Sequence, residues 1–115
     1  MKLLLDNQRE ELIRNHLHGG ARHRGAVRWD AKPVVKLFVC VGGNATWLLS
    51  ELDPETNIAY GLCDLGLGYP EMGYVSLTEL EETLDWRLER DRHWTPTKTL
   101  TEYANDARAE GMVVA

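Results

Sequence analysis

Asp91 and His93 are the residues of this 115-residue chain whose types and spacing best suit acid–base chemistry. They lie two positions apart in the stretch LERDRHW, so on a strand their side chains would face the same side. Glu51 or Asp64 could complete such a group with a further carboxylate. No G-x-S-x-G nucleophile motif accompanies them. Charged residues between a helix and an edge strand are commonly ion-paired, and we favour that structural interpretation.

The histidines His16, His18 and His23 form a second group with chemical potential, because histidine is a frequent metal ligand. Residues two apart on a helix do not share a face, so His16 and His18 would point in different directions. The segment holds no HExxH motif and no cysteine. We therefore expect a surface cluster, and we expect neither a metal nor another cofactor.

The glycines of the stretch GLGYPEMG could indicate a phosphate-binding loop. Gly66, Gly68 and Gly73 form neither a GxGxxG nor a GxxxxGK[ST] pattern. The loop is also expected to join two strands, whereas phosphate loops lead from a strand into a helix. These glycines are interpreted as turn residues.

Charge is distributed very unevenly. Residues 1–36 carry eight Lys/Arg and four Asp/Glu, residues 37–86 carry nine Asp/Glu and no Lys/Arg, and residues 87–115 carry five of each. Such an asymmetry points to a partner of opposite charge. Glu79 is expected to cap a helix, and the other eight acids are the candidate partner-binding residues: Glu51, Asp53, Glu55, Asp64, Glu71, Glu81, Glu82 and Asp85.

The same acidic region argues against direct binding of nucleic acid, because aromatic platforms for bases come with a basic groove. Trp47, inside an expected strand, is assigned to the core. Cys40 and Cys63 each lie in an apolar run without a CxxC partner and are expected to be buried, free thiols. No run approaches the ~18 apolar residues of a membrane span. We expect a cytoplasmic protein without a membrane partner.

The chain is expected to form one domain over residues 1–115. A helix should begin at Asp6 or Asn7, either of which can cap it, and end at Gly19-Gly20. Four strands are expected from β-branched and aromatic runs, over residues 34–41, 45–52, 58–65 and 72–75.

Two capping boxes predict the later helices. Ser76 with Glu79 should begin one helix, and Thr99 with Glu102 should begin another that runs to Gly111. The apolar stripes of these two helices are Leu77, Leu80, Leu84 and Leu88, and then Tyr103, Ala104 and Ala107. The expected class is α+β: an antiparallel sheet of about four strands, with an N-terminal helix and two later helices packed on it.

The order of several motifs resembles one bacterial family. VVKLF, ATWLLSELDPE, YGLCDLGLGYPEMGYVSLTELE and ERDRHWTPTKTLTEY follow the pattern of the family catalogued as domain of unknown function 2958, from about Pro33 to Tyr103. The resemblance implies a small protein carried by plasmids, integrated elements and phages, near genes that blunt host defence. It implies no reaction, cofactor or catalytic residue.

Two functions remain open. The first is a non-enzymatic inhibitor of anti-CRISPR or anti-restriction type, which docks its acidic surface on a basic, nucleic-acid-binding host effector. A row of carboxylates could compete for such a groove, because DNA carries about one charge per 1.7 Å of its axis. The alternative is a small, hydrolase-like enzyme that uses Asp91, His93 and a nearby carboxylate. Convergence of these side chains in a pocket would favour the enzyme. The sequence leaves the oligomeric state open.

Overall fold

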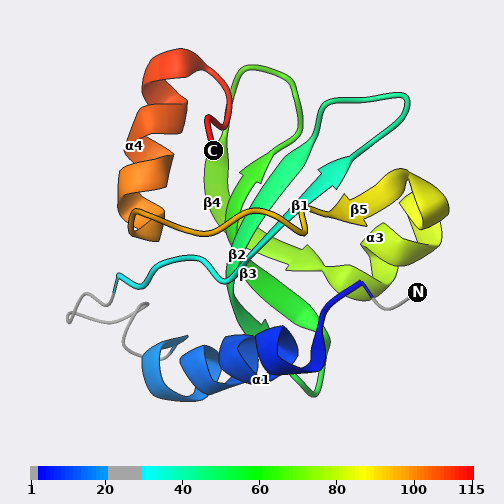
Figure 1. The fold of residues 1–115 in the computed structure, drawn as a ribbon, viewed down its shortest axis with the longest axis vertical. Helices are drawn as coiled ribbons and strands as arrows, with labels where there is room; N and C mark the ends of the chain where they lie inside the picture. The colour runs from blue at the N-terminus through cyan, green and yellow to red at the C-terminus, as the bar shows by residue number, and fades with distance from the viewer. Residues whose placement is uncertain (1–2, 21–29) are drawn as a thin grey trace.

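The centre of the fold is a five-stranded antiparallel sheet, seen in the computed structural model, which describes residues 3–20 and 30–115 (Figure 1). Its strands lie in the order β4-β3-β2-β1-β5. Their bounds are Val35–Val39 for β1, Thr46–Asp53 for β2, Ile58–Asp64 for β3, Glu71–Ser76 for β4 and Leu88–Arg90 for β5. The first four strands agree with the predicted ones within a few residues, and the α+β class is confirmed.

The fifth strand is the addition to the predicted sheet. β5 has three residues and pairs antiparallel with β1, with Leu37 opposite Arg90 and Val39 opposite Leu88. A strand this short leaves no alternation that the sequence could reveal. Its place at the sheet edge follows from pairing with a distant segment.

Within the part of the chain that the structure describes, three α-helices flank the sheet. They are α1 (Asp6–Asn15), α3 (Leu77–Leu84) and α4 (Leu100–Glu110). A π-helical turn, η1 (His16–Gly20), continues α1, and a 3₁₀ turn, η2 (Asp85–Arg87), follows α3. In Figure 1, α1 crosses below the sheet, α3 lies beside β5, and α4 stands at the opposite side.

The starts of α3 and α4 are capped as predicted. Ser76 Oγ accepts the N–H of Glu79 at 3.2 Å. Thr99 Oγ1 accepts the N–H of Glu102 at 3.3 Å, and the Glu102 carboxylate accepts the Thr99 N–H at 2.9 Å, which completes a capping box. Each cap satisfies backbone donors that the first helical turn leaves without a partner.

The predicted cap of α1 is wrong. The cap residue is Leu5, ahead of Asp6 and Asn7, and its N–H donates to Gln8 Oε1 at 3.0 Å. A glutamine three residues into the helix can reach back to a free backbone donor, so a residue without a polar side chain serves as the cap. The helix itself begins at Asp6, one of the two predicted starts.

Apolar side chains form a core on each face of the sheet. Val35, Leu37, Trp47, Leu49 and Leu52 pack with residues of α1 and α3 on one face. Leu48 and Leu62 pack on the other face with the α4 residues Leu100, Tyr103, Ala104 and Ala107. The core position of Trp47 and the inner face of α4 are confirmed. The leucine stripe of α3 also faces the core, although Leu88 belongs to β5.

The two cysteines differ, and the prediction of two buried thiols is wrong for Cys40. Cys40 follows the last residue of β1 and is exposed. Cys63 lies within β3 and is half-buried, and desolvation raises the pKa of its thiol to about 11. An apolar run in the sequence does not show where the strand ends. β1 ends at Val39, so Cys40 lies beyond the strand.

Candidate functional site

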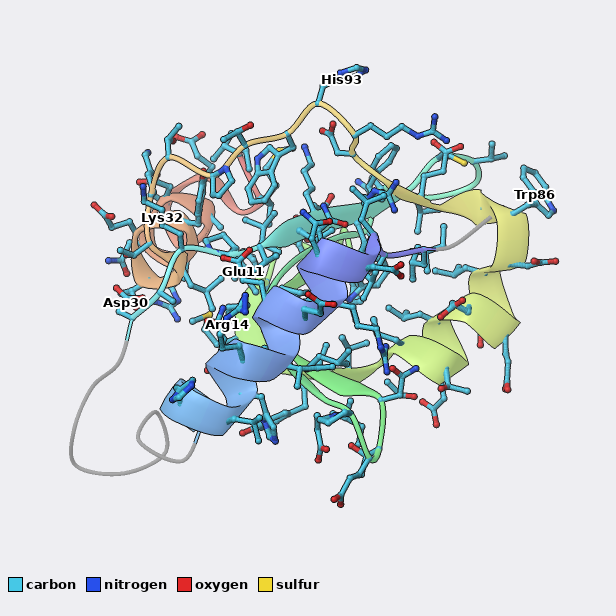
Figure 2. All side chains as sticks on the ribbon, turned by 60° about the horizontal axis from the view of Figure 1, so that its bottom comes forward. Glu11, Arg14, Asp30, Lys32, Trp86 and His93 are labelled. Carbon is cyan, nitrogen blue, oxygen red and sulfur yellow. The ribbon has the colours of Figure 1, made fainter. Side chains whose placement is uncertain are left out.

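The proposed acid–base pair does not form between side chains. Asp91 Oδ1 accepts the backbone N–H of His93 at 3.1 Å, and Asp91 Oδ2 lies 3.6 Å from Lys36 Nζ. Both residues follow β5, which ends at Arg90, so the alternation expected on a strand does not apply. Figure 2 shows His93 on the outer loop with its ring directed away from the body of the protein. This arrangement is a local turn stabilised by an ion pair.

Glu51, one of the two carboxylates expected to complete that group, lies elsewhere in the sheet. It is only 2% exposed. β2 extends past its last pairing with β1, and the register shifts between Leu49 and Glu51. Asn15 Nδ2 donates to the Ser50 carbonyl at 3.0 Å, so the end of α1 covers this open edge. His16 Nδ1 lies 4.0 Å from Glu51 Oε1 as a result.

Asp64, the other carboxylate, is 3% exposed at the end of β3. Its Oδ1 accepts the N–H of Gly66 at 2.8 Å, and its Oδ2 accepts the N–H of Val113 at 2.9 Å. The side chain thus joins the loop after β3 to the segment after α4. Glu51 and Asp64 are buried and cannot belong to an exposed acidic surface.

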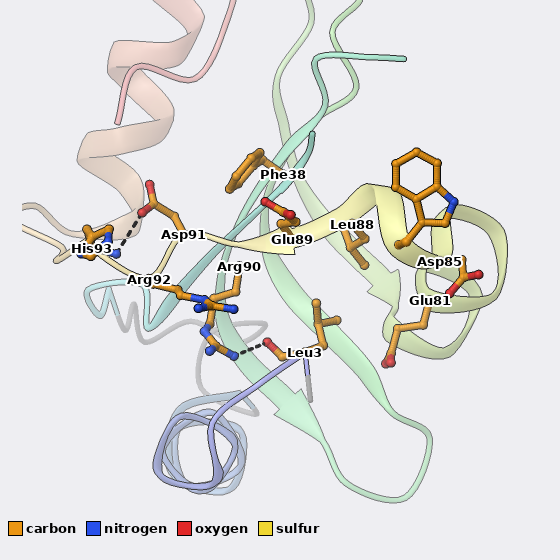
Figure 3. A pocket seen from close by; sticks show the side chains of 11 residues that line it. Leu3, Phe38, Glu81, Asp85, Leu88, Glu89, Arg90, Asp91, Arg92 and His93 are labelled. Carbon is orange, nitrogen blue, oxygen red and sulfur yellow. Dashed lines mark hydrogen bonds between the residues drawn. The ribbon is translucent and has the colours of Figure 1, made fainter. Parts of the chain in front are cut away.

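A hollow of ≈ 650 Å³ lies between α3 and β5 (Figure 3). Glu81, Asp85 and Trp86 line it on the α3 side. Asp91 and His93 line it on the other side, without Glu51 or Asp64. The hollow therefore gathers Asp91 and His93 with the carboxylate of Glu89, while the two carboxylates named from the sequence lie elsewhere.

Arg90 fixes one wall of this hollow. Its Nη1 donates to the Leu3 carbonyl at 2.7 Å, which joins β5 to the segment before α1. Figure 3 shows Arg90 and Arg92 toward this side, while Glu81 and Asp85 lie at the other end. The hollow thus has only acids on its α3 side, and two arginines together with Asp91 toward the loop after β5.

The histidine cluster is only partly described. His16 is half-buried beside Glu51, His18 is exposed, and His23 lies outside the described residues. Across residues 3–20 and 30–115, no three His, Cys, Asp or Glu side chains are grouped to hold a metal ion.

Three of the remaining acids lie in or beside turns. Asp53, at the end of β2, accepts the N–H of Glu55 at 2.9 Å, and this hydrogen bond holds the pKa of the Asp53 carboxyl below its usual value. Glu55 is exposed in that turn, and Glu71 is exposed at the start of β4. Asp53 thus has a structural role, and the other two acids face solvent far apart in the sheet register.

The other three acids form one surface, which we call the acidic α3 surface: Glu81, Glu82 and Asp85. All three are exposed, while the leucines Leu77, Leu80 and Leu84 face the core. The helical period therefore separates the acids from the leucines. Of the eight predicted residues, these are the ones that the fold brings together.

The position of these acids does not favour the helix. α3 has no basic residue in its last turn, and Asp85 is its C-cap with φ 50° and ψ −123°. Carboxylates at a helix C-terminus oppose the macrodipole, which favours cations there by about 0.3–1 kcal/mol. Arg87 partly offsets this, because its guanidinium donates to the carbonyls of Thr83 at 3.0 Å and Leu84 at 3.3 Å.

Trp86 follows this unusual C-cap and is 67% exposed. Figure 2 shows its indole directed outward at the end of α3. Trp94 instead packs on Tyr103, with ring centroids 6.0 Å apart, and Trp29 lies outside the described residues. An exposed tryptophan beside carboxylates is a feature that no motif in the sequence predicts.

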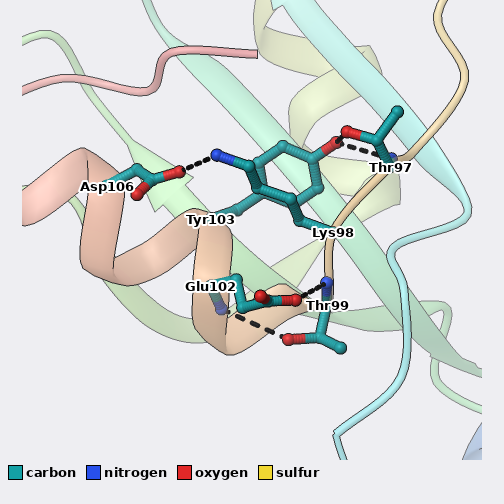
Figure 4. A network of polar contacts seen from close by, with 6 residues as sticks. All are labelled: Thr97, Lys98, Thr99, Glu102, Tyr103 and Asp106. Carbon is teal, nitrogen blue, oxygen red and sulfur yellow. Dashed lines mark hydrogen bonds and ion pairs between the residues drawn. The ribbon is translucent and has the colours of Figure 1, made fainter.

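The charged residues before α4 form a structural network (Figure 4). Lys98 forms an ion pair with Asp106, which raises the pKa of Lys98. The hydroxyl of Tyr103 accepts the N–H of Thr97 at 2.9 Å. With the Thr99 cap, these contacts fix the start of α4 on its sheet face, and they account for the polar residues there.

A different signal could have revealed the buried acids. Glu51 stands within the apolar strand TWLLSELD, and Asp64 ends the apolar strand IAYGLCD. A lone acid inside such a run indicates either an outward position or a buried, hydrogen-bonded one. The bulge in β2 leads to the burial of Glu51, and the segment after α4 to that of Asp64. Neither feature can be predicted from the neighbouring residues in the sequence.

The fold and these sites define a small α+β protein with an antiparallel sheet and an acidic helix surface. The chain belongs to the family described as "Protein of unknown function (DUF2958)", whose model matches residues 3–114. This confirms the resemblance and extends it to the amino-terminal third. No curated protein and no solved structure matches the chain. Among the described residues, no helix is long and apolar enough to cross a membrane.

Proposed function

We propose that this protein is a non-enzymatic binding protein that docks the acidic α3 surface on a basic protein. In this proposal it is a counter-defence inhibitor carried by a mobile genetic element. Its partner is a host effector that binds nucleic acid, of the CRISPR or restriction type. The carboxylates would occupy lysines and arginines that otherwise contact phosphates.

The observation that carries the proposal is the placement of Glu81, Glu82 and Asp85 at the end of α3. Acids cost stability at this end of a helix, so their presence is not explained by the fold. No lysine or arginine occurs from residue 37 to residue 86, and the next cation, Arg87, binds the carbonyls of α3.

The hollow beside α3 offers a seat for a basic side chain. An arginine that entered it from the α3 side would meet the carboxylates of Glu81 and Asp85 and the indole of Trp86. Guanidinium groups pair with carboxylates and stack on aromatic rings. This pairing supports a protein partner rich in arginine.

The test is binding to a panel of purified CRISPR and restriction effectors, measured by biolayer interferometry. For the effector that binds, Glu81→Lys/Glu82→Lys should lower the association rate about tenfold or more, since charge complementarity acts mainly on encounter. Raising the ionic strength from about 0.1 M to about 1 M should weaken the wild-type complex, because the screening length falls from about 10 Å to about 3 Å.

The matched control is Glu10→Lys/Glu11→Lys, which reverses two adjacent exposed acids on α1 and changes the net charge equally. Its association rate should stay within about twofold of wild type if location matters more than net charge. Equal loss in both variants, or a complex that tolerates reversal of the α3 acids, would defeat the proposal.

A further inference from the structure

We propose that the apolar end of the sheet is a docking surface for a protein that surrounds an apolar patch with basic residues. The apolar end is Val41, Leu65, Leu67, Tyr69, Met112 and Val114. This inference deepens the proposed function and rests on it for the basic character of the partner. It adds the contact from which most of the affinity would come.

The exposure of this end is unusual. Across the described residues, eleven large apolar side chains are exposed, and six of them lie here. Tyr69 is 81% exposed and Leu67 is 73% exposed. The contributing segments, 41–44, 65–70 and 111–115, contain no Asp, Glu, Lys or Arg, although 27% of the chain is charged. Apolar surface concentrated in this way marks interaction sites.

The three segments are joined because the β3–β4 loop contacts each of the other two. Buried Asp64 accepts N–H groups from Gly66 and Val113, which ties the β3–β4 loop to the segment after α4. A Cβ on Gly66 would lie 1.8 Å from Asn44 Oδ1, so the β1–β2 loop lies against the same loop. Figure 1 shows the two loops projecting from one end of the sheet, with the C-terminal segment beside the β3–β4 loop.

The surface is also conformationally defined. Within the described part of the chain, the glycines with positive φ are Gly42, Gly66, Gly68 and Gly111, and all of them lie in these segments. Glycine adopts this backbone region at little cost, so the loops are built around specific turns. A preorganised surface loses less conformational freedom when a partner binds.

An apolar groove continues from this end toward α3. It has a volume of ≈ 330 Å³, and Leu65 lines it together with Trp47, Val75, Leu80 and Leu84. An aliphatic or aromatic side chain of a partner could enter beside Leu65. Anchors of this kind provide most of the energy of protein interfaces.

Charge at the border selects the occupant. Glu71 follows the 65–70 segment, Glu110 precedes the 111–115 segment, and Glu79 lines the groove; all three are exposed. A second copy would bring like charges together, and an anionic bilayer would be repelled. A partner protein with lysines or arginines around an apolar patch would match this surface. Its apolar patch would pack on the apolar side chains, and its cations would pair with the glutamates at the border, as in interfaces with an apolar core and a polar rim.

The test uses a synthetic peptide with a central Leu-Phe-Leu sequence and two lysines on each side. Two-dimensional ¹H–¹⁵N NMR should show shifts for residues 41–44, 65–69 and 112–114 on titration. A peptide with glutamates in place of the lysines, and one with serines in place of the apolar residues, should each bind at least about tenfold more weakly.

The matched variants are Leu67→Ser and Leu17→Ser, because Leu67 and Leu17 are 73% and 71% exposed. Leu67→Ser should weaken binding about tenfold, and Leu17→Ser should leave it within about twofold. The inference is overturned if the lysine-flanked peptide does not bind, or if both variants lose binding equally.

Two further measurements separate the other occupants. Sedimentation should give a monomer for wild type and for Leu67→Ser; a wild-type dimer lost in Leu67→Ser would make this end a self-interface and overturn the inference. Co-sedimentation with phosphatidylcholine vesicles, with and without phosphatidylserine, should show no binding, and lipid binding abolished by Leu67→Ser would also overturn it.

The peptide result and the effector result can fail separately. Suppose that the lysine-flanked and glutamate-flanked peptides bind equally well and the serine peptide does not. The basic character of the partner would then be refuted, and the apolar end would remain a docking surface. Peptide binding at the apolar end together with effector binding indifferent to Glu81→Lys/Glu82→Lys would defeat the proposed function alone.

Discussion

The acidic α3 surface and the apolar end differ in chemistry and in how they are held. The α3 acids stand on a capped helix whose leucines face the core, and they lie where the helix dipole opposes them. The apolar end consists of loops joined by one buried carboxylate, Asp64. A helix can expose charged side chains while its apolar side chains pack in the core. Exposed apolar loops have no such packing, and here buried hydrogen bonds hold them in place.

The largest expected effect comes from removing the carboxylate under the loops. Asp64→Ala would leave the N–H groups of Gly66 and Val113 without their acceptor, and it should lower the free energy of unfolding by about 3 kcal/mol. Asp106→Ala, which removes an exposed ion-pair partner of Lys98, should change it by less than about 1 kcal/mol. Urea unfolding measures both. Similar losses in the two variants would contradict the role given to Asp64.

A series of glycine-to-alanine variants tests the turns in the loops of the apolar end. Gly66→Ala should lower the free energy of unfolding by about 2 kcal/mol, because the position has a positive φ and a Cβ there would clash with Asn44. Gly68→Ala should lower it by about 1 kcal/mol, because that position has a positive φ but no clash. Gly43→Ala has neither and should be neutral or slightly stabilising. Thermal and urea unfolding give the order. A costly Gly43→Ala would show that the loops do not depend on the particular turns described.

The two thiols report on the junction between the regions. Cys40 is exposed, and its N–H donates to the Arg87 carbonyl at 2.8 Å, so it lies between the β1–β2 loop and the end of α3. It should react with a thiol reagent at pH 8 at least about tenfold faster than Cys63, because thiolate is the reactive form. Burial raises the pKa of Cys63 to about 11, so its labelling should increase as pH rises toward that value. Cys40→Ser and Cys63→Ser assign the rates. Equal native rates would contradict the burial of Cys63.

The smallest expected effect lies on α3. Glu81→Lys/Glu82→Lys should raise the free energy of unfolding by about 0.5 kcal/mol, because it places cations at the helix C-terminus. The gain should shrink at high salt. Urea unfolding at two ionic strengths tests this. A clear destabilisation would mean that these acids serve the fold, and it would weaken the argument that they serve a partner.

Local sequence patterns predicted the parts of the fold that depend on neighbours in the chain. The four strands, the Thr99 capping box and the inner face of α4 are of this kind. They could be predicted because side-chain alternation and helix caps act over a few residues. The strand β5 could not, because its pairing partner is about fifty residues away in β1.

The candidate site was harder to predict because burial depends on distant segments. Glu51 is buried by a bulge and by the end of α1, and Asp64 by the segment after α4. Leu67 and Tyr69 stand beside glycines that the sequence predicts to form a turn, and nothing local shows that these apolar residues remain exposed. The exposure of the α3 acids agrees with their polar positions on a helix whose leucines face the core.

The order of the strands has a consequence for how the chain folds. β1 to β4 are sequential neighbours, while α1 closes the open edge of β2 and β5 joins β1 from beyond α3. Short-range pairings form before long loops are closed, because closing a longer loop costs more entropy. We expect the β2–β3–β4 meander to form early and to exchange its amide hydrogens last. The N–H groups of β5, which hold a three-residue strand at the other edge, should exchange first among the strands.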